Sequence, residues 1–257
     1  MKKLTSILLI ILTLLSLSAC GKPKAKKTTS FDKGDAKVIA HRGLSGIEVE
    51  NTEAAFIAAG QRSYYGIEAD VRKTADGKFV MCHDDNLKRI SGKDIAVETS
   101  TMAELQNVKL YGTEERLCNL STYIEICKRY DKQAILELKS DFTEDEIAGI
   151  IEIINSHEYI DRVTFISFSY TNLEYVRAIL PEQSVMYLFK KMSDETTEKL
   201  VRNRIDVAIS YKELTKEALN KFHEAGLTVN CWTVDDKRTA EKLADMGVDY
   251  ITTNILE

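Results

Sequence analysis

Short apolar runs and amphipathic segments alternate along most of this chain. Segments with helical periodicity follow most of the apolar runs, at 52–62, 143–156 and 171–180 and near 194–203, 215–225 and 237–246. The apolar runs themselves have the length and composition of strands and number eight: 37–42, 66–71, 134–139, 163–168, 185–189, 206–210, 228–234 and 249–253. Alternation of strands and helices predicts a parallel sheet, and eight such units predict an α/β fold, the TIM-type (β/α)8 barrel.

One further apolar run, Phe79 to Cys82, falls outside this alternation. It follows the turn signal Ala75-Asp76-Gly77 and predicts the return strand of a β-hairpin that leaves the barrel. Residues 84–132 form the longest connection and hold two predicted helices, around 101–107 and 120–130. The chain has 257 residues, 44% of them hydrophobic, and no Pro-, Gly- or Ser-rich linker after residue 35. We therefore expect one domain over residues 36–257.

Charged side chains gather where the predicted strands end. Glu68 and Asp70 are two residues apart in one strand and point to the same face. If the hairpin pairs about Asp76, His83 returns beside Asp70. The first strand runs into His41-Arg42-Gly43, and the strand from Gln133 carries Glu137 and Lys139. Buried parallel strands have this pattern when their carboxyl ends open into an active site.

The three carboxylates of Glu68, Asp70 and Glu137 form a predicted metal site. Hard oxygen ligands of this kind suit one divalent cation, Mg²⁺ or Ca²⁺. A histidine next to such a site can move a proton on a coordinated substrate. The segment from Glu68 to Asp85 therefore has the features of half of a metal-assisted phosphodiesterase site.

Several motifs occur in an order that resembles the glycerophosphodiester phosphodiesterase family. The resemblance runs from Val38 to Asn254 and rests on these residues: His41-Arg42-Gly43, Glu50-Asn51-Thr52 with Ala55-Phe56, Glu68-x-Asp70, Thr74-x-Asp76-Gly77, His83-Asp84, Leu87-x-Arg89, Glu137-Leu138-Lys139 and Trp232-Thr233-Val234. It implies metal-dependent hydrolysis of glycerophosphodiesters to sn-glycerol 3-phosphate and an alcohol. It also implies that the hairpin and the helices of 84–132 form an insertion at the carboxyl-terminal rim of the barrel.

The resemblance also implies roles for individual residues. His41 and His83 would be the general acid and base, in an order that the sequence leaves open. Arg42 and Lys139 would bind the phosphate, and Trp232 would pack on the glycerol or alcohol portion. Glu50 would face the site as a further substrate-binding residue, whereas we expect Asn51 to cap the first helix. Direct attack by water and a cyclic phosphate intermediate use the same groups, so both routes stay open.

The chain departs from the family pattern at two places. Val49 stands where members usually have Pro, and Asn254-Ile255-Leu256 stands where many have Asp-x-Pro. We expect these changes to affect loop shape and substrate fit rather than the reaction. Two other functions remain: lysophospholipase D activity on lysolipids, which needs an apolar groove for an acyl chain, and a substrate-binding lipoprotein without catalysis. We would expect a binding protein without catalysis to have lost a histidine or a carboxylate of the site, but both histidines and all three carboxylates are present.

The N-terminus predicts export. Lys2-Lys3, the apolar stretch Leu4 to Leu17 and the small residues before Cys20 have the form of a signal peptide over residues 1–19. They resemble a bacterial lipobox, which implies a lipid on Cys20 and attachment to the outer face of a bacterial membrane. The alternative, a transmembrane helix, needs about 18 or more consecutive apolar residues. Residues 20–35 are polar and lysine-rich and are expected to form a flexible tether.

The net charge and the spacing of the remaining cysteines limit the kinds of partner and metal that we expect the protein to bind. Loss of Lys2 and Lys3 with the signal changes the formal charge from −5 to −7, which argues against nucleic-acid binding. The expected partners are a small phosphodiester and the membrane, with the oligomeric state open. Four cysteines outside the lipobox lack metal-binding spacing and suit buried thiols as well as disulfides. His157 and His223 lie in helical segments and are expected to be surface or packing residues.

Overall fold

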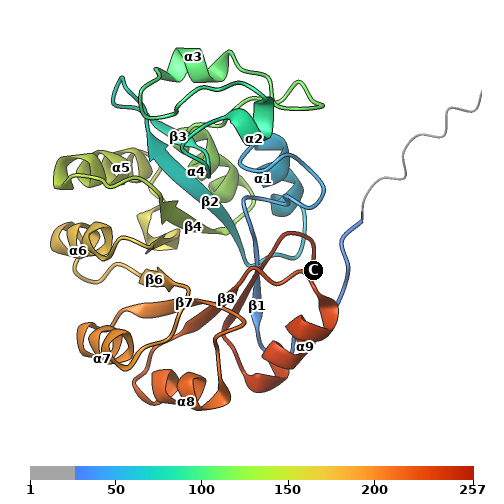
Figure 1. The fold of residues 1–257 in the computed structure, drawn as a ribbon, viewed down its shortest axis with the longest axis vertical. Helices are drawn as coiled ribbons and strands as arrows, with labels where there is room; N and C mark the ends of the chain where they lie inside the picture. The colour runs from blue at the N-terminus through green and yellow to red at the C-terminus, as the bar shows by residue number, and fades with distance from the viewer. Residues whose placement is uncertain (1–26) are drawn as a thin grey trace, which may run out of the picture.

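The barrel predicted from the sequence is confirmed in a computed structural model that describes residues 27–257 (Figure 1). The predicted signal segment and Cys20 lie outside the described residues. Neighbouring strands pair in parallel in the order β1-β9-β8-β7-β6-β5-β4-β2, and β1 pairs with β2 to close the ring. The eight strands are β1 (Lys37–Ala40), β2 (Gly66–Lys73), β4 (Gln133–Leu138), β5 (Val163–Ser167), β6 (Val185–Phe189), β7 (Asp206–Ser210), β8 (Val229–Trp232) and β9 (Tyr250–Thr253).

Helices lie outside the ring of strands (Figure 1). A capping box starts one of them, because the Thr143 side chain accepts from the Glu146 N–H and Glu146 accepts in return from the Thr143 N–H. A 3₁₀ turn, Ile160–Arg162, leads into β5. The outer helices are α1 (Glu53–Gly60), α4 (Leu120–Arg129), α5 (Glu144–Ser156), α6 (Tyr170–Ile179), α7 (Asp194–Asn203), α8 (Lys216–Glu224) and α9 (Lys237–Met246).

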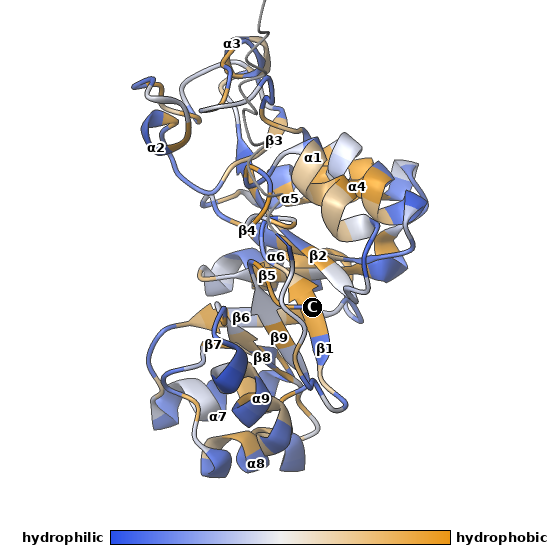
Figure 2. Cartoon of the chain, turned by 90° about the vertical axis from the view of Figure 1, so that its right-hand side faces the viewer, coloured by the Kyte–Doolittle hydropathy of each residue, from blue (hydrophilic) through white to orange (hydrophobic). Residues whose placement is uncertain are grey.

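The hairpin and the insertion extend one end of the molecule. Strand β3 (Phe79–Met81) pairs antiparallel with β2, with Val71 opposite Met81, so the predicted hairpin is confirmed. Beyond it lie α2 (Lys88–Ser91) and α3 (Met102–Gln106), at the end of the molecule opposite α7 and α8 in both views (Figures 1 and 2). Helix α2 was not predicted, because four residues are too few to show a helical period. The insertion has its own apolar cluster, which includes Leu87, Leu105 and Leu117.

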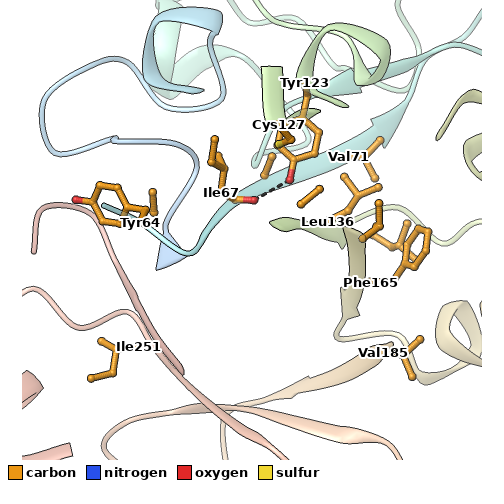
Figure 3. Packing of buried hydrophobic residues seen from close by; sticks show 14 of the residues in the cluster. Tyr64, Ile67, Val71, Tyr123, Cys127, Leu136, Phe165, Val185 and Ile251 are labelled. Atoms are coloured by element: carbon orange, nitrogen blue, oxygen red, sulfur yellow. Dashed lines mark hydrogen bonds between the residues drawn. The ribbon is translucent and has the colours of Figure 1, made fainter. Parts of the chain in front are cut away.

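Most of the apolar core lies between the strands and the helices (Figure 3). A smaller cluster fills the barrel interior with Ile39, Ile135, Ile166, Met186, Leu188 and Ala208. Tyr123 of α4 is fully buried in the outer core, and its hydroxyl donates to the backbone oxygen of Ile67 at 2.7 Å. The hydrogen bond ties α4 to β2, the strand that carries two of the predicted metal ligands.

The folded domain begins before residue 36, the start that the sequence predicted. Thr29 pairs with Leu256 in a parallel bridge, its N–H donates to the Ile255 carbonyl at 3.0 Å, and Phe31 packs against the core. Residues 28–31 therefore lie against the barrel instead of belonging to a tether. Within the described residues, no helix has both the length and the apolarity to cross a bilayer.

The four cysteines of residues 27–257 are buried free thiols: Cys82, Cys118, Cys127 and Cys231. Burial raises the pKa of the Cys82 and Cys231 thiols to about 12 and that of the other two further. The sequence left open whether these cysteines form disulfides or stay as thiols, and in the structure they are thiols.

We predict that Tyr123→Phe lowers the free energy of unfolding by about 1–2 kcal/mol, because the buried Ile67 carbonyl loses its hydroxyl donor. For a domain of this size the thermal midpoint should fall by roughly 2–4 °C per kcal/mol. Tyr111→Phe is the matched control, since the Tyr111 side chain is 62% exposed. Thermal denaturation followed by circular dichroism measures both, and equal midpoints for the two variants would contradict the prediction.

Candidate active site

Three buried carboxylates meet at the carboxyl ends of β2 and β4. Asp70 and Glu137 are paired in register across these strands, and Glu68 shares the face of Asp70 on β2. One oxygen from each of the three lies within 4.8 Å of the others, so the predicted ligands can hold a divalent cation. Glu68 Oε1 and Asp70 Oδ1 are buried without a hydrogen-bond partner among the described residues. Such oxygens fit a metal ion, which needs free acceptor atoms.

Two basic side chains and one amide face the carboxylates. Arg42 Nε lies 3.4 Å from Asp70 Oδ2, and Lys139 Nζ lies 2.9 Å from Glu137 Oε1 and 3.8 Å from Asp70 Oδ1. The Asn51 amide donates to Asp70 Oδ2 at 2.8 Å and accepts from the Asp70 N–H at 3.2 Å. Two positive charges leave the three carboxylates with an excess negative charge when all are ionised. A bound cation would neutralise it.

The pKa of Asp70 is lowered and those of Glu68 and Glu137 are raised, because the three carboxyl groups have different neighbours. Burial acts to raise the pKa of Asp70, but Arg42 and Lys139 outweigh it and hold that pKa below its usual value. Burial, followed by repulsion from Asp70, raises the pKa of Glu137 to about 8 and raises that of Glu68 well above its ordinary value. Without a cation, protons reduce the repulsion in the cluster. A divalent ion must therefore displace protons when it binds.

The turn after β1 has a strained backbone that aims Arg42 at the cluster. Arg42 has a φ of 54° and Gly43 a φ of 74°. A Cβ at residue 43 would lie 2.6 Å from the backbone carbon of Ala55, so only glycine fits. The Arg42 N–H donates to Glu68 Oε2 at 2.7 Å. This hydrogen bond helps to hold a conformation that costs an L-residue about 1–2 kcal/mol.

The two predicted catalytic histidines line one cavity of about 90 Å³. His41 follows β1, and its Nε2 lies 3.9 Å from Glu68 Oε2. His83 follows β3, and its Nδ1 lies 2.6 Å from Asp84 Oδ1. Burial, with Arg42 next in effect, lowers the pKa of His41 to about 4, and burial also lowers the pKa of His83. Both shifts favour the neutral form of the imidazole.

The same cavity joins the charged cluster to an apolar wall. Phe168 meets Trp232 edge to face, with ring centroids 5.6 Å apart, and the Trp232 indole N–H is buried without a partner among the described residues. The complete lining is His41, Arg42, Glu68, His83, Glu137, Lys139, Ile166, Phe168, Leu188, Asn230, Trp232, Thr233 and Thr252. A small molecule with an anionic end and a compact organic end fits this lining.

Glu50 lies beside this cavity instead of lining it. It belongs to an adjoining cavity of about 570 Å³ that shares His41 and Arg42 with the first. Its carboxylate accepts from Arg42 Nη1 at 2.9 Å and from Arg89 at 2.7 and 2.8 Å. Arg89 also donates to Asp84, the partner of His83, at 2.6 Å. Glu50 and Arg89 therefore link Arg42 to His83.

Asn51 was wrongly predicted to cap α1. Thr52 is the cap, and its side chain accepts from the Ala55 N–H, while Asn51 adopts a φ of 57° and binds Asp70. Either residue type can cap a helix, and only the contact with Asp70 distinguishes them. Asn254 was not predicted as a site residue, but its side chain lies 2.8 Å from His41 Nδ1. This departure from the family pattern therefore affects more than loop shape.

The two histidines expected to be structural lie away from the site. His157 Nε2 is 2.8 Å from the Ser121 hydroxyl, and His223 Nε2 is 2.9 Å from Asp249 Oδ2. Neither residue lines the site cavity. His223 therefore offers a control for substitutions at the site.

Comparison with known proteins points to one family. The sequence profile of the glycerophosphoryl diester phosphodiesterase family matches residues 41–257. A glycerophosphodiester phosphodiesterase of Caldanaerobacter subterraneus is 28% identical over 229 residues, which cover 84% of this chain and 93% of that protein.

Solved structures agree in fold and length. A phosphodiesterase of Oleispira antarctica, in complex with its product sn-glycerol 3-phosphate, superposes with a TM-score of 0.80 at 29% identity, covering 85% of this chain and 92% of the other. A glycerophosphodiester phosphodiesterase of Thermotoga maritima superposes with a TM-score of 0.72 at 26% identity, covering 85% and 94%.

We predict that stability in chelator falls as pH rises from 6.5 to 8. The raised pKa of Glu137 means that its stabilising contribution is complete below its unfolded pKa of 4.5 and is lost as pH approaches 8. The lowered pKa of His41 acts in the opposite direction, but only below pH 6.5. Added Mg²⁺ or Ca²⁺ should therefore raise the thermal midpoint more at pH 8 than at pH 6.5.

Differential scanning fluorimetry at the two pH values measures this effect. The variant Glu137→Gln carries no titrating group at this position, so its stability in chelator should depend less on pH between 6.5 and 8 than that of the wild type. A cation-induced shift of equal size at both pH values would contradict the proton displacement.

Proposed function

Since this chain belongs to the glycerophosphoryl diester phosphodiesterase family, we propose that it hydrolyses glycerophosphodiesters to sn-glycerol 3-phosphate and an alcohol. The observation that carries the proposal is the convergence of three carboxylates, two basic side chains and two histidines on one small cavity. A phosphodiester is anionic, and its hydrolysis requires charge neutralisation and proton transfer at both ends of the displacement.

The proposed roles follow from the positions of the side chains. Arg42 and Lys139 bind the phosphate oxygens beside the carboxylates, Arg42 with the planar fork that fits two oxygens. His41 and His83 exchange protons with the attacking and leaving oxygens. The Trp232 and Phe168 rings contact the organic end of the substrate. Both histidines line the same cavity from strand ends.

We propose a single Mg²⁺ or Ca²⁺ ion as the cofactor, held by Glu68, Asp70 and Glu137. The all-oxygen donor set favours these hard cations over zinc or copper. When bound, the ion supplies positive charge that polarises the phosphoryl group. The free oxygens of Glu68 and Asp70 support this assignment.

The lysolipid alternative has less support. Among residues 27–257, the large hydrophobic side chains that are strongly exposed are Tyr111, Phe168 and Val201, and of these Phe168 alone lines the site cavity. An acyl chain would need a longer apolar surface. A binding protein without catalysis is also disfavoured, because both histidines and all three carboxylates are present and adjacent.

We also propose that the chain is a lipoprotein held on the outer face of a bacterial membrane through Cys20. The support is the sequence of residues 1–20. Residues 21–27 would then form the tether, and the enzyme domain would begin near Thr28, whose hydroxyl donates to Glu257 at 2.7 Å.

We predict metal-dependent release of glycerol 3-phosphate from glycerophosphocholine and glycerophosphoethanolamine by a fragment that begins at Lys27. His41→Gln and His83→Gln should each lower kcat by about 10²- to 10⁴-fold, the usual range for a general acid or base. The control His223→Gln should keep the wild-type rate. Release is measured by an enzyme-coupled assay with Mg²⁺, with Ca²⁺ and with chelator.

No release by folded fragment with either ion would refute the proposed reaction, and near-normal turnover by His41→Gln would remove His41 from the mechanism. Release from lysophosphatidylcholine alone would favour the lysolipid alternative.

We predict that Cys20→Ser transfers the full-length protein from the membrane to the soluble fraction of an expressing bacterium. The serine cannot carry the lipid that anchors the chain. Cys231→Ser is the control, since Cys231 is buried in β8. Incorporation of a labelled fatty acid into wild type, and its loss in Cys20→Ser alone, is the second measurement; an unlabelled wild-type protein would refute the anchor.

A further inference from the structure

The side chain of Asn254 lies between His41 and Asp235, immediately after β9. Asn254 Oδ1 is 2.8 Å from His41 Nδ1, and Asn254 Nδ2 donates to Asp235 Oδ2 at 2.6 Å. The Asn254 backbone N–H donates to the other Asp235 oxygen at 2.8 Å. Asp235 thus holds Asn254 at two points, and Asn254 holds the imidazole.

The carboxylate determines which end of the Asn254 amide faces His41. An ionised carboxylate has no proton to donate, so Asp235 must receive the NH₂ end of the amide. The oxygen end then faces His41. The Ser45 hydroxyl is compatible with this orientation, because it lies 2.7 Å from Asn254 Oδ1 and 2.8 Å from the His41 backbone carbonyl and can donate its one proton to either oxygen.

The amide orientation in turn determines the tautomer of His41. An amide oxygen can only accept, so Nδ1 of the imidazole must carry the proton. In neutral His41 the lone pair is then on Nε2, the atom on the side of Glu68 and the site cavity. The opposite tautomer would place two acceptors 2.8 Å apart at Nδ1 and Oδ1.

We propose that Asn254, oriented by Asp235, is a positioning residue that keeps His41 in the Nδ1–H tautomer with Nε2 directed at the substrate. The catalytic consequence rests on the proposed function, whereas the tautomer is a property of the folded chain and can be observed without turnover. His83 is held differently, since its Nδ1 faces the carboxylate of Asp84. The two histidines therefore have separate positioning groups.

Asp235→Asn is the most direct test. The oxygen of the introduced amide can still accept from the Asn254 and Thr253 donors that Asp235 serves. The NH₂ group of the introduced amide can also donate to Asn254 Oδ1, so the Asn254 amide is no longer forced into one orientation. We expect the second tautomer of His41 to appear and kcat to fall by about 10- to 100-fold, with KM changed less than about twofold.

The exchange variant Asp235→Asn with Asn254→Asp restores the network with the two groups transposed. The carboxylate introduced at position 254 then accepts from His41 Nδ1, and the amide introduced at position 235 donates to that carboxylate. We expect this variant to return His41 to the Nδ1–H tautomer and to recover most of the lost kcat. A purely structural role for Asp235 predicts no such recovery.

The tautomer is read at pH 8 from two-bond ¹H–¹⁵N correlations of the histidine ring, with His41 signals assigned by their absence in His41→Gln. Asp249→Asn is the control, because Asp249 bonds His223 far from the site and its loss should change neither the His41 signals nor kcat. Thermal denaturation confirms that each variant is folded.

A single Nδ1–H tautomer and unchanged kcat in Asp235→Asn would overturn the proposal, as would an exchange variant that recovers neither. If the wild type shows the tautomer but releases no glycerol 3-phosphate, the proposed function fails while the assignment of the tautomer stands.

Discussion

Three like charges buried together impose the main constraint on this molecule. Glu68, Asp70 and Glu137 have 7% of their surface exposed or less, and their repulsion is strong where water is excluded. Arg42 and Lys139 offset part of it from different sides, and Asn51 binds Asp70. The charge of the cluster is therefore balanced only when a cation or protons occupy it, and a cation that bound there would also stabilise the fold.

The backbone around the site is arranged by that cluster. Glu68 accepts the Arg42 N–H, the Gly43 N–H donates to the Glu68 carbonyl, and the Asn51 N–H donates to the Arg42 carbonyl. Both Arg42 and Asn51 have a positive φ, which is a strained conformation for residues other than glycine. In this conformation the Arg42 N–H donates to Glu68 and the Asn51 amide donates to Asp70. The motif His41-Arg42-Gly43 thus combines an imidazole that lines the cavity, a positively charged side chain and the glycine that allows the turn.

The barrel was predictable because its strands are buried on both faces and its helices have clear periods and caps. All eight strands, α1 and the helices from α3 to α9 lie close to their predicted positions. The carboxylates and histidines were also predictable, because strand ends and face alternation bring them together. Asn51 and Asn254 were not, since an amide has no pattern that separates a cap from a buried hydrogen bond, and each acts through a partner distant in sequence. Helix α2 and the start of the domain near Thr28 depend on contacts between segments that no local period records.

The burial of the cysteines bears on how the chain would survive outside the cell. Thiol–disulfide exchange proceeds through the thiolate, and a pKa of about 12 leaves Cys82 and Cys231 roughly one thiolate in 10⁵ molecules at pH 7. In the folded domain these thiols are thus protected from oxidants that capture accessible thiols. The four cysteines of residues 27–257 are exposed to such oxidants when the domain unfolds. If the chain is exported as proposed, a wrong disulfide could form between translocation and folding, and closure of the barrel would protect the thiols.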